Sequence, residues 1–127
     1  PELLALLRAN PGRFSYASPG VGSPPHLVGE LLKQAAGLDM AHVPYRGGNP
    51  ALLDLLAGRV HLLFDTTNGP LAAVREGKVR ALAVLDPRRN PVLSDVPALA
   101  EAVPGVEIAG RIALCGPAGL PLRVVER

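Results

Sequence analysis

Segments with the pattern of short strands alternate with segments of helical pattern along this chain, and a glycine or proline turn closes almost every one. Apolar residues at positions 27, 28, 31, 32, 35 and 36 form one stripe of a helix, which Ser23 caps and Gly37 ends. Met40–Tyr45 then has the composition of a strand. Strands and helices in alternation are typical of an α/β fold built on a mostly parallel sheet.

The same reasoning predicts five strands and the helices between them. The strands are expected at Arg13–Ala17, Met40–Tyr45, Val60–Asp65, Val79–Leu85 and Val106–Cys115. Helices are expected over Glu2–Ala9, from Ser23 to Gly37, from an Asn49 cap to Gly58, and from Asn68-Gly69-Pro70 to Gly77, with one or two helical turns within Val96–Val103. The mostly apolar run Val79–Leu85 indicates a strand buried on both faces. The predicted fold is α/β, with a mixed, mostly parallel five-stranded sheet flanked by helices.

Length and charge balance argue against several classes of protein. A chain of 127 residues suits one domain, and 48% hydrophobic with 19% charged residues is a globular composition. The net charge is +2, the basic residues stand singly or in pairs such as Arg88–Arg89, and the chain has two tyrosines, two phenylalanines and no tryptophan. Nucleic-acid binding is therefore not expected. The longest apolar runs are far below the roughly 20 residues that cross a bilayer.

The turn from residue 18 to residue 26 is the strongest candidate for a ligand site. It follows a predicted strand and opens a predicted helix, and its glycines let backbone N–H groups converge on a small anion. The candidate ligand-binding residues here are Ser18, Gly20, Val21, Gly22, Ser23 and His26. Any turn of this kind needs glycine and a cap, so a purely structural role stays open. The dinucleotide fingerprint and the phosphate-loop motif are both absent.

Two further loops are expected at the same edge of the sheet, where α/β folds bind ligands. Tyr45, Arg46 and Gly47 offer a phenol, a guanidinium and backbone amides, although Arg46 is equally well explained as a solvated charge. Asp65 follows the third strand, and it either contacts a ligand or holds loops together. The sequence therefore predicts a rim of mainly neutral hydrogen-bonding groups.

Metal and catalytic chemistry find little support in the spacing of reactive residues. His26, His42 and His61 lie on separate predicted elements without metal-ligand spacing, and Cys115 is expected to be an inert apolar side chain. A small hydrolase would need Ser18 or Ser23 as nucleophile, His26 as base and Asp65 to orient it, but no Gly-x-Ser-x-Gly elbow is present. We therefore expect no catalytic residue, no metal and no cofactor.

Several motifs together resemble the substrate-binding receptors of tripartite tricarboxylate transporters, also called the Bug family. They are Asn10-Pro11-Gly12-Arg13-Phe14-Ser15-Tyr16-Ala17-Ser18-Pro19-Gly20, Gly22-Ser23, His26-Leu27, His42-Val43-Pro44-Tyr45-Arg46-Gly47, the helix from Ala51 to Gly58, Phe64-Asp65, Gly77-Lys78-Val79-Arg80-Ala81-Leu82-Ala83-Val84 and Asp95-Val96-Pro97. They follow the family's order and approximate spacing over nearly the whole chain. Arg111 departs from the pattern, because the family often has tryptophan there.

The resemblance implies a type II periplasmic-binding-protein fold, in which two lobes close on a carboxylate. It places residues 1–112 in the second ligand-binding lobe, and residues 113–127 in the return crossover and the start of a helix toward the first lobe. The chain is accordingly expected to be a fragment of a periplasmic receptor. Its expected partners are a small carboxylate, the first lobe of the same receptor and the membrane subunits of a transporter.

Two other functions remain open from the sequence: the ligand-sensing domain of a regulator, and the small hydrolase described above. A single lobe is expected to bind ligand weakly, because half of the cleft is missing. Apolar residues near Ile112, Leu114 and Leu120 are expected to be left uncovered, which makes self-association of the fragment plausible.

Overall fold

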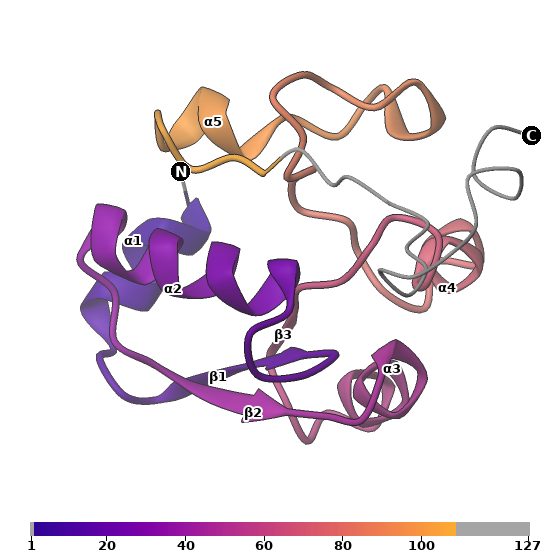
Figure 1. Cartoon of the computed structure of the whole chain (residues 1–127), viewed down its shortest axis with the longest axis horizontal. Helices are drawn as coiled ribbons and strands as arrows, with labels where there is room; N and C mark the ends of the chain where they lie inside the picture. Colours follow the sequence, from indigo (N-terminus) through magenta and orange to yellow (C-terminus); the bar gives the residue numbers. More distant parts are fainter. Residues whose placement is uncertain (1, 109–127) are drawn as a thin grey trace, which may run out of the picture.

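The computed structural model describes residues 2–108, which contain a three-stranded parallel sheet (Figure 1). The strands are β1 (Phe14–Ser18), β2 (Met40–Pro44) and β3 (Leu62–Leu63), in the order β2-β1-β3. Tyr16 of the central strand stands opposite His42 on one side and Leu62 on the other. The carboxyl ends of β1 and β2 therefore meet at one edge, as the sequence predicts.

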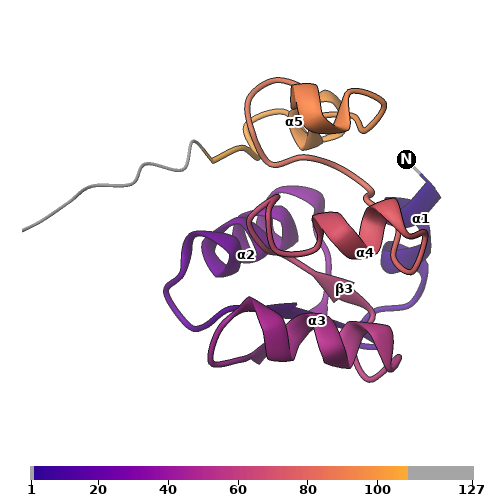
Figure 2. The same ribbon diagram turned by 90° about the vertical axis from the view of Figure 1, so that its right-hand side faces the viewer.

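Helices cover both faces of this sheet. They are α1 (Glu2–Ala9), α2 (Pro24–Ala36), α3 (Gly48–Leu56), α4 (Leu71–Arg75) and α5 (Leu99–Ala102), with a 3₁₀ turn, η1, at Pro91–Leu93. Figure 2 shows α2 and α3 on opposite sides of the strands. None of the helices in residues 2–108 has the length and apolar character needed to cross a membrane.

The helix α2 begins and ends where the sequence predicts. The Ser23 hydroxyl accepts a hydrogen bond from the backbone N–H of His26, and two prolines occupy the first turn. At the other end Gly37 adopts a left-handed conformation with φ 64°, and its N–H donates to the carbonyl of Lys33. These signals are local in the chain, which is why the sequence locates them.

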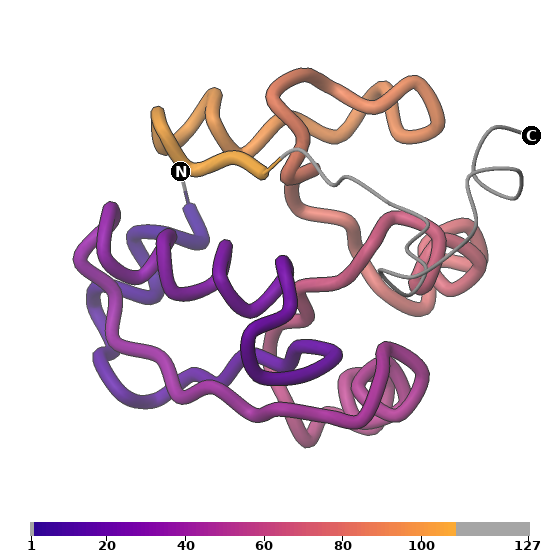
Figure 3. Tube along the Cα trace, viewed as in Figure 1, coloured from indigo at the N-terminus to yellow at the C-terminus, as the bar shows by residue number. Residues whose placement is uncertain are grey.

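The alternation of side chains along β1 divides the core into two clusters. Tyr16 belongs to the larger cluster, which lies against α1 and α2, whereas Ala17 packs with Ala51 and Val60 on the α3 side. The buried residues of the larger cluster are Leu7, Tyr16, Val28, Leu32, Ala36, Leu38, Met40, Leu99, Val103 and Val106. The segment around α5 thus folds back over α1 and α2 and closes the core (Figure 3).

The prediction of five strands is not confirmed, because the sheet of the described residues has three. The predicted strand Val79–Leu85 is an extended segment in which only Val84 forms a bridge, to Ala98. It is not buried on both faces either, because 47% of Leu82 is exposed. A mostly apolar run indicates burial but does not specify a pairing partner. In this run Ala83 and Leu85 pack against the larger core cluster, and no residue of it joins β1 or β3.

Three smaller corrections concern the ends of elements. The helix α3 begins at Gly48 with Gly47 as its cap residue, so the predicted Asn49 cap is wrong. The strand predicted at Val60–Asp65 is reduced to Leu62–Leu63, because only these residues pair with β1. Of the last predicted strand, Val106–Ile108 is not a strand, and the remainder, with Arg111 and Cys115, lies outside the described residues.

Gly29 is the position where α2 touches the aromatic core. A Cβ added to Gly29 would lie 2.5 Å from Cε2 of Tyr16, so the ring packs directly against the helix backbone. Replacing glycine by alanine in a helix normally stabilises a protein by about 0.5–1 kcal/mol. Gly29→Ala is instead expected to destabilise this chain by about 1–3 kcal/mol through overpacking, measured by urea denaturation.

A matched control for this substitution is Gln34→Ala, on the exposed side of the same helix. Its free energy of unfolding should change by no more than about 0.5 kcal/mol. A Gly29→Ala variant as stable as the parent chain, or more stable, would contradict the contact between Gly29 and Tyr16.

Candidate functional site

The loops that follow β1 and β2 are held together at the carboxyl edge of the sheet. The backbone N–H of Tyr45 donates to the carbonyl of Ser18, and the N–H of Gly47 donates to the carbonyl of Pro19, both at 3.0 Å. We call residues 18–23 and 45–47 the rim. The two segments that the sequence predicts as ligand-binding are therefore neighbours bonded through their main chains.

The carbonyl of Gly20 organises the first of these loops. The hydroxyl of Ser23 donates to it at 2.7 Å, and the hydroxyl of Ser18 donates to it at 3.2 Å. The N–H of Gly20 donates in turn to the Ser18 hydroxyl at 3.3 Å. Gly22 follows with φ 78°, a conformation that favours glycine. The result is a compact turn in which both serine side chains bond to the loop itself.

Most backbone amides of this turn already have acceptors. The N–H of Gly20 bonds to Ser18, that of Gly22 to Nδ1 of His26 at 3.1 Å, and that of Ser23 to the carbonyl of Gly20 at 3.3 Å. Within the described part of the chain, the N–H of Val21 meets no acceptor, and 75% of this residue is exposed. More backbone amides of the predicted anion-binding turn are therefore engaged in internal hydrogen bonds than the glycine spacing suggests.

The second loop directs its phenol away from the rim. The hydroxyl of Tyr45 donates to Oδ2 of Asp54 on α3 at 2.8 Å, while Oδ1 of Asp54 accepts from Arg59. The bond to Asp54 raises the pKa of Tyr45, and the same bond lowers the pKa of Asp54. Arg46 is exposed at the rim. The guanidinium rather than the phenol is therefore the polar side chain that this loop presents to solvent.

The side chain of Asp65, which follows β3 in the chain, lies against Gly48, the first residue of α3. A Cβ added to Gly48 or to Gly69 would overlap its carboxylate, so this side chain is enclosed between two glycines. Its Oδ1 also accepts a hydrogen bond from the N–H of Thr66 at 2.7 Å. A carboxylate beside the first turn of a helix is favourable because the helix dipole is positive there. Of the two roles left open for Asp65, this geometry favours that of holding loops together.

His42 is the residue of this region that sequence reasoning missed. Its Nε2 lies 2.7 Å from Oγ of Ser18, and its ring stacks on Tyr16 with a centroid separation of 4.8 Å. The His26 ring lies beside it, with a centroid separation of 4.2 Å. The available signal was the position of His42 in its strand, two residues before the end of β2, as Tyr16 is two residues before the end of β1.

Glu30 and Lys33 extend this cluster along α2. The hydroxyl of Tyr16 donates to Glu30 at 2.6 Å, and Glu30 forms an ion pair with Lys33 at 2.9 Å. Burial, followed by the bond to Glu30, raises the pKa of Tyr16, and that same bond lowers the pKa of Glu30. Burial lowers the pKa of His42, and the nearby His26 lowers it further. At neutral pH the cluster therefore contains a neutral phenol, a neutral His42 and a carboxylate–ammonium pair.

The residues of the hydrolase hypothesis have other partners. Ser18 is fully buried and contacts His42 rather than His26. Ser23 bonds to the backbone N–H of His26, while the His26 ring accepts from Gly22. No group of three or more His, Cys, Asp or Glu side chains that could hold a metal ion occurs in residues 2–108. The geometry therefore does not pair Ser18 or Ser23 with the His26 ring, as the hydrolase hypothesis requires.

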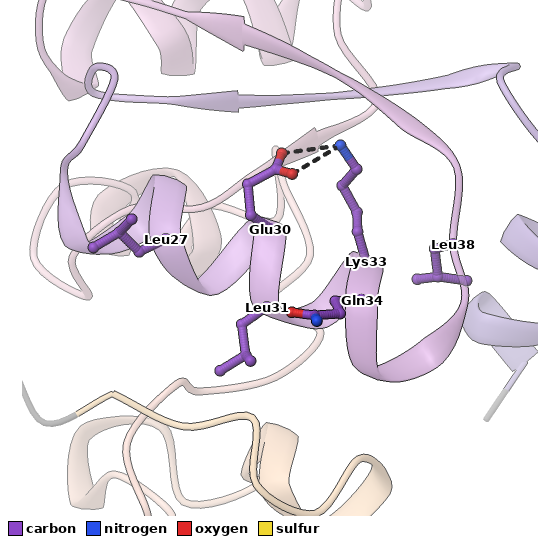
Figure 4. A pocket seen from close by; sticks show the side chains of 6 residues that line it. All are labelled: Leu27, Glu30, Leu31, Lys33, Gln34 and Leu38. Carbon is purple, nitrogen blue, oxygen red and sulfur yellow. Dashed lines mark hydrogen bonds and ion pairs between the residues drawn. The ribbon is translucent and has the colours of Figure 1, made fainter.

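An open hollow of about 580 Å³ runs along α2 (Figure 4). It is lined by Leu27, Glu30, Leu31, Lys33, Gln34 and Leu38. None of the predicted site residues lines it. The hollow is therefore a feature distinct from the rim.

The double role of Ser23 at the rim leads to a stability prediction. Ser23→Ala removes both the cap of α2 and the bond to the Gly20 carbonyl, so the free energy of unfolding should fall by about 0.5–2 kcal/mol. Ser23→Thr retains the hydroxyl and should restore most of this loss in the same urea titration. A Ser23→Ala variant of unchanged stability would contradict the assigned cap.

The pKa of His42 leads to a prediction about pH. Because this pKa is lower in the folded chain than in the unfolded chain, the unfolded chain binds more protons as the pH falls below its histidine pKa. The stability that depends on uncharged His42 is fully present above the pKa that this residue has in the unfolded chain. It is lost as the pH falls through the lower pKa that His42 has in the folded chain. The urea midpoint should therefore fall between about pH 7.5 and about pH 5.

The control is His42→Gln, which does not titrate and should show a smaller fall over the same interval. The carboxylates whose pKa values are lowered, such as Glu30 and Glu101, lose their stabilising charge only at more acidic pH. An equal fall in parent and variant would contradict the assignment to His42.

Comparisons with known proteins place these features in a family. The family model described as "Tripartite tricarboxylate transporter family receptor" matches residues 1–127. A protein of Pseudomonas sp. (strain P51), encoded in the tcbD-tcbE intergenic region, is 42% identical over 99% of this chain and 38% of its own length. Protein BugT of Bordetella pertussis is 36% identical over 78% of this chain and 30% of its own length. The chain thus spans less than half the length of these relatives.

Solved structures agree with the sequence comparison. The Rhodopseudomonas palustris protein Rpa4515, solved with adipate, superposes with a TM-score of 0.94 at 38% identity, over 98% of this chain and 42% of that protein. MatC from the same organism, solved with malate, superposes with a TM-score of 0.75 at 32% identity, over 84% of this chain and 37% of that protein. The predicted α/β fold of the periplasmic binding proteins is confirmed. The chain belongs to the receptor family of the tripartite tricarboxylate transporters, as its motifs indicate.

Proposed function

We propose that this chain is one ligand-binding lobe of an extracytoplasmic receptor that captures a small carboxylate for a tripartite tricarboxylate-type transporter. In this proposal residues 1–112 form the lobe, and residues 113–127 form the crossover toward a first lobe. The observation that carries the proposal is the superposition on a receptor solved with adipate, at a TM-score of 0.94 over 98% of this chain. The family match over residues 1–127 supports the same assignment.

The geometry of the rim suits capture of a ligand between two lobes. Its two loops are bonded to each other at 3.0 Å through Tyr45 and Ser18, so the surface offered to a ligand is already organised before binding. The rim lies at the carboxyl ends of parallel strands, where α/β folds place their ligands. Preorganised loops lose little conformational freedom when a ligand arrives, which favours affinity.

The contacts that we propose follow from which polar groups are available. The exposed N–H of Val21 donates to a ligand carboxylate, and Arg46 supplies positive charge from the opposite loop. Gly20, Gly22 and Gly47 let the ligand approach the main chain closely, and ordered water completes the remaining hydrogen bonds. The other predicted site residues, Ser18, Ser23, His26, Tyr45 and Asp65, shape these loops through the bonds described above.

Adipate and malate, named for two of the related structures, are both dicarboxylates. We therefore propose a small dicarboxylate as the ligand class. Closure of a first lobe over the rim would exclude water and strengthen these electrostatic contacts. No covalent bond changes in this mechanism, and the arrangement of Ser23 and His26 favours it over the hydrolase alternative.

The experiment is isothermal calorimetry with adipate, malate and a monocarboxylate control, on the complete two-lobe receptor and on the 127-residue chain. The complete receptor should bind a dicarboxylate, and the single lobe should bind it much more weakly. Arg46→Ala should weaken binding by about 10- to 100-fold, the usual effect of losing a charge-assisted hydrogen bond. Arg88→Ala, an exposed arginine on another loop, is the control.

Two results would count against this proposal. Failure of the complete receptor to bind any carboxylate would move the assignment toward a regulator or an enzyme. Equal affinities for Arg46→Ala and Arg88→Ala would remove Arg46 from the site while leaving the receptor function in place.

A further inference from the structure

We infer that His42 is a positioning residue for the ligand loop, and that the bond from Gly22 to His26, which needs an unprotonated ring nitrogen, makes the shape of this loop sensitive to pH. The inference rests on the proposed function and extends it to the control of binding by pH. His42 lies on β2 and contacts the ligand loop through Ser18, the buried last residue of β1. It therefore acts through another residue rather than on the ligand.

The first link in this inference is the hydroxyl of Ser18. Ser18 is fully buried, and its Oγ lies 2.7 Å from Nε2 of His42. The same oxygen bonds to both the carbonyl and the N–H of Gly20, at 3.2 and 3.3 Å. A buried hydroxyl without its imidazole partner would lose its shortest hydrogen bond and could turn away from Gly20. His42 thus fixes the start of the ligand loop.

The second link is the ring of His26. Its Nδ1 accepts a hydrogen bond from the N–H of Gly22 at 3.1 Å. An imidazolium carries a proton on both ring nitrogens and cannot accept a hydrogen bond. Protonation of His26 therefore breaks the bond that holds the middle of the loop. The N–H of Gly22 is beside Val21, whose amide we assign to the ligand.

The third link is the distance between the two rings. Their centroids are 4.2 Å apart, so a proton on either ring disfavours a proton on the other. The other titratable or charged groups facing them are Tyr16 on β1 and Glu30 and Lys33 on α2. Glu30 is already bonded to both Tyr16 and Lys33, at 2.6 and 2.9 Å. The charge of Glu30 raises the pKa of His42, but burial and the neighbouring His26 each lower it by more.

Together these contacts couple the loop to pH. While Nδ1 of His26 carries no proton, residues 18–23 are held at both ends. When acid adds a proton to Nδ1 of His26, the Gly22 bond is lost, and the loop no longer presents its preorganised surface. The receptor is then expected to bind its dicarboxylate more weakly in acid.

The first test uses the 127-residue chain and needs no ligand. Nuclear magnetic resonance follows the amide signals of Gly20 and Gly22 and the imidazole nitrogens of His26 and His42 from about pH 8 to about pH 5. The amide of Gly22 should shift in step with the imidazole signals. Amide signals that stay constant while the histidines titrate would overturn the inference.

Two variants separate positioning from simple packing. His42→Gln provides a neutral amide that can still reach Ser18, so it should keep the Gly20 signal of the parent. His42→Phe retains the ring on Tyr16 but cannot bond to Ser18, so the Gly20 signal should be displaced at every pH. Identical spectra for both variants would overturn the role of the bond to Ser18.

The second test measures dicarboxylate affinity of the complete receptor at about pH 7.5 and about pH 5. The parent should bind about three- to tenfold more weakly at the lower pH, the effect of one hydrogen bond. His26→Gln, which cannot gain a proton at the atom that faces Gly22, should show a smaller change, and because ligand ionisation affects both proteins equally, this comparison isolates His26. An equal change in both would overturn the inference. If no carboxylate binds at any pH while the amides still respond, the proposed function fails and the hold of the two histidines on the loop stands.

Discussion

The central strand β1 is paired along both of its edges, and the rest of the structure depends on that double pairing. Its parallel register with β2 places Tyr16 beside His42 and Ser18 beside Pro44. The loops that leave these two strands must then emerge together, and the bonds from Tyr45 and Gly47 hold them there. Because β1 is also the strand whose alternation separates the two core clusters, one short segment connects the packing of both helical layers to the candidate site.

The aromatic and polar contacts above α2 add a second layer to this arrangement. Gly29 lets the ring of Tyr16 lie against the helix backbone, and the Tyr16 hydroxyl bonds to Glu30 one residue further on. The same ring supports His42, which bonds to Ser18 at the rim. Helix packing and loop geometry are therefore coupled through a few side chains. A change in the core near Gly29 is expected to be felt at the loop as well as in the overall stability.

Sequence reasoning succeeded where the determining signals are local. The cap of α2 at Ser23, its end at Gly37 and the meeting of the 18–23 and 45–47 loops all follow from short motifs and from the rule that parallel strands share a carboxyl edge. It failed where partners are distant in the chain. The apolar run Val79–Leu85 bridges to Ala98 rather than joining the sheet, and no local pattern encodes that choice. Likewise, the role of His42 arises from its contact with Ser18, which lies on another strand. The bonds from the Gly20 and Gly22 amides to Ser18 and His26 are local, but they depend on side-chain orientations that the turn motif does not specify.

The central claim is that the rim is one wall of a carboxylate-binding cleft. Hydrogen–deuterium exchange on the complete receptor, with and without a saturating dicarboxylate, tests it most directly because it reports the location of binding rather than its strength. The proposed cleft predicts slower exchange on ligand addition in the amides of residues 18–23 and 45–47, with little change at the far end of α2. Protection confined to other parts of the lobe, or to the hollow along α2, would contradict the assignment of the rim.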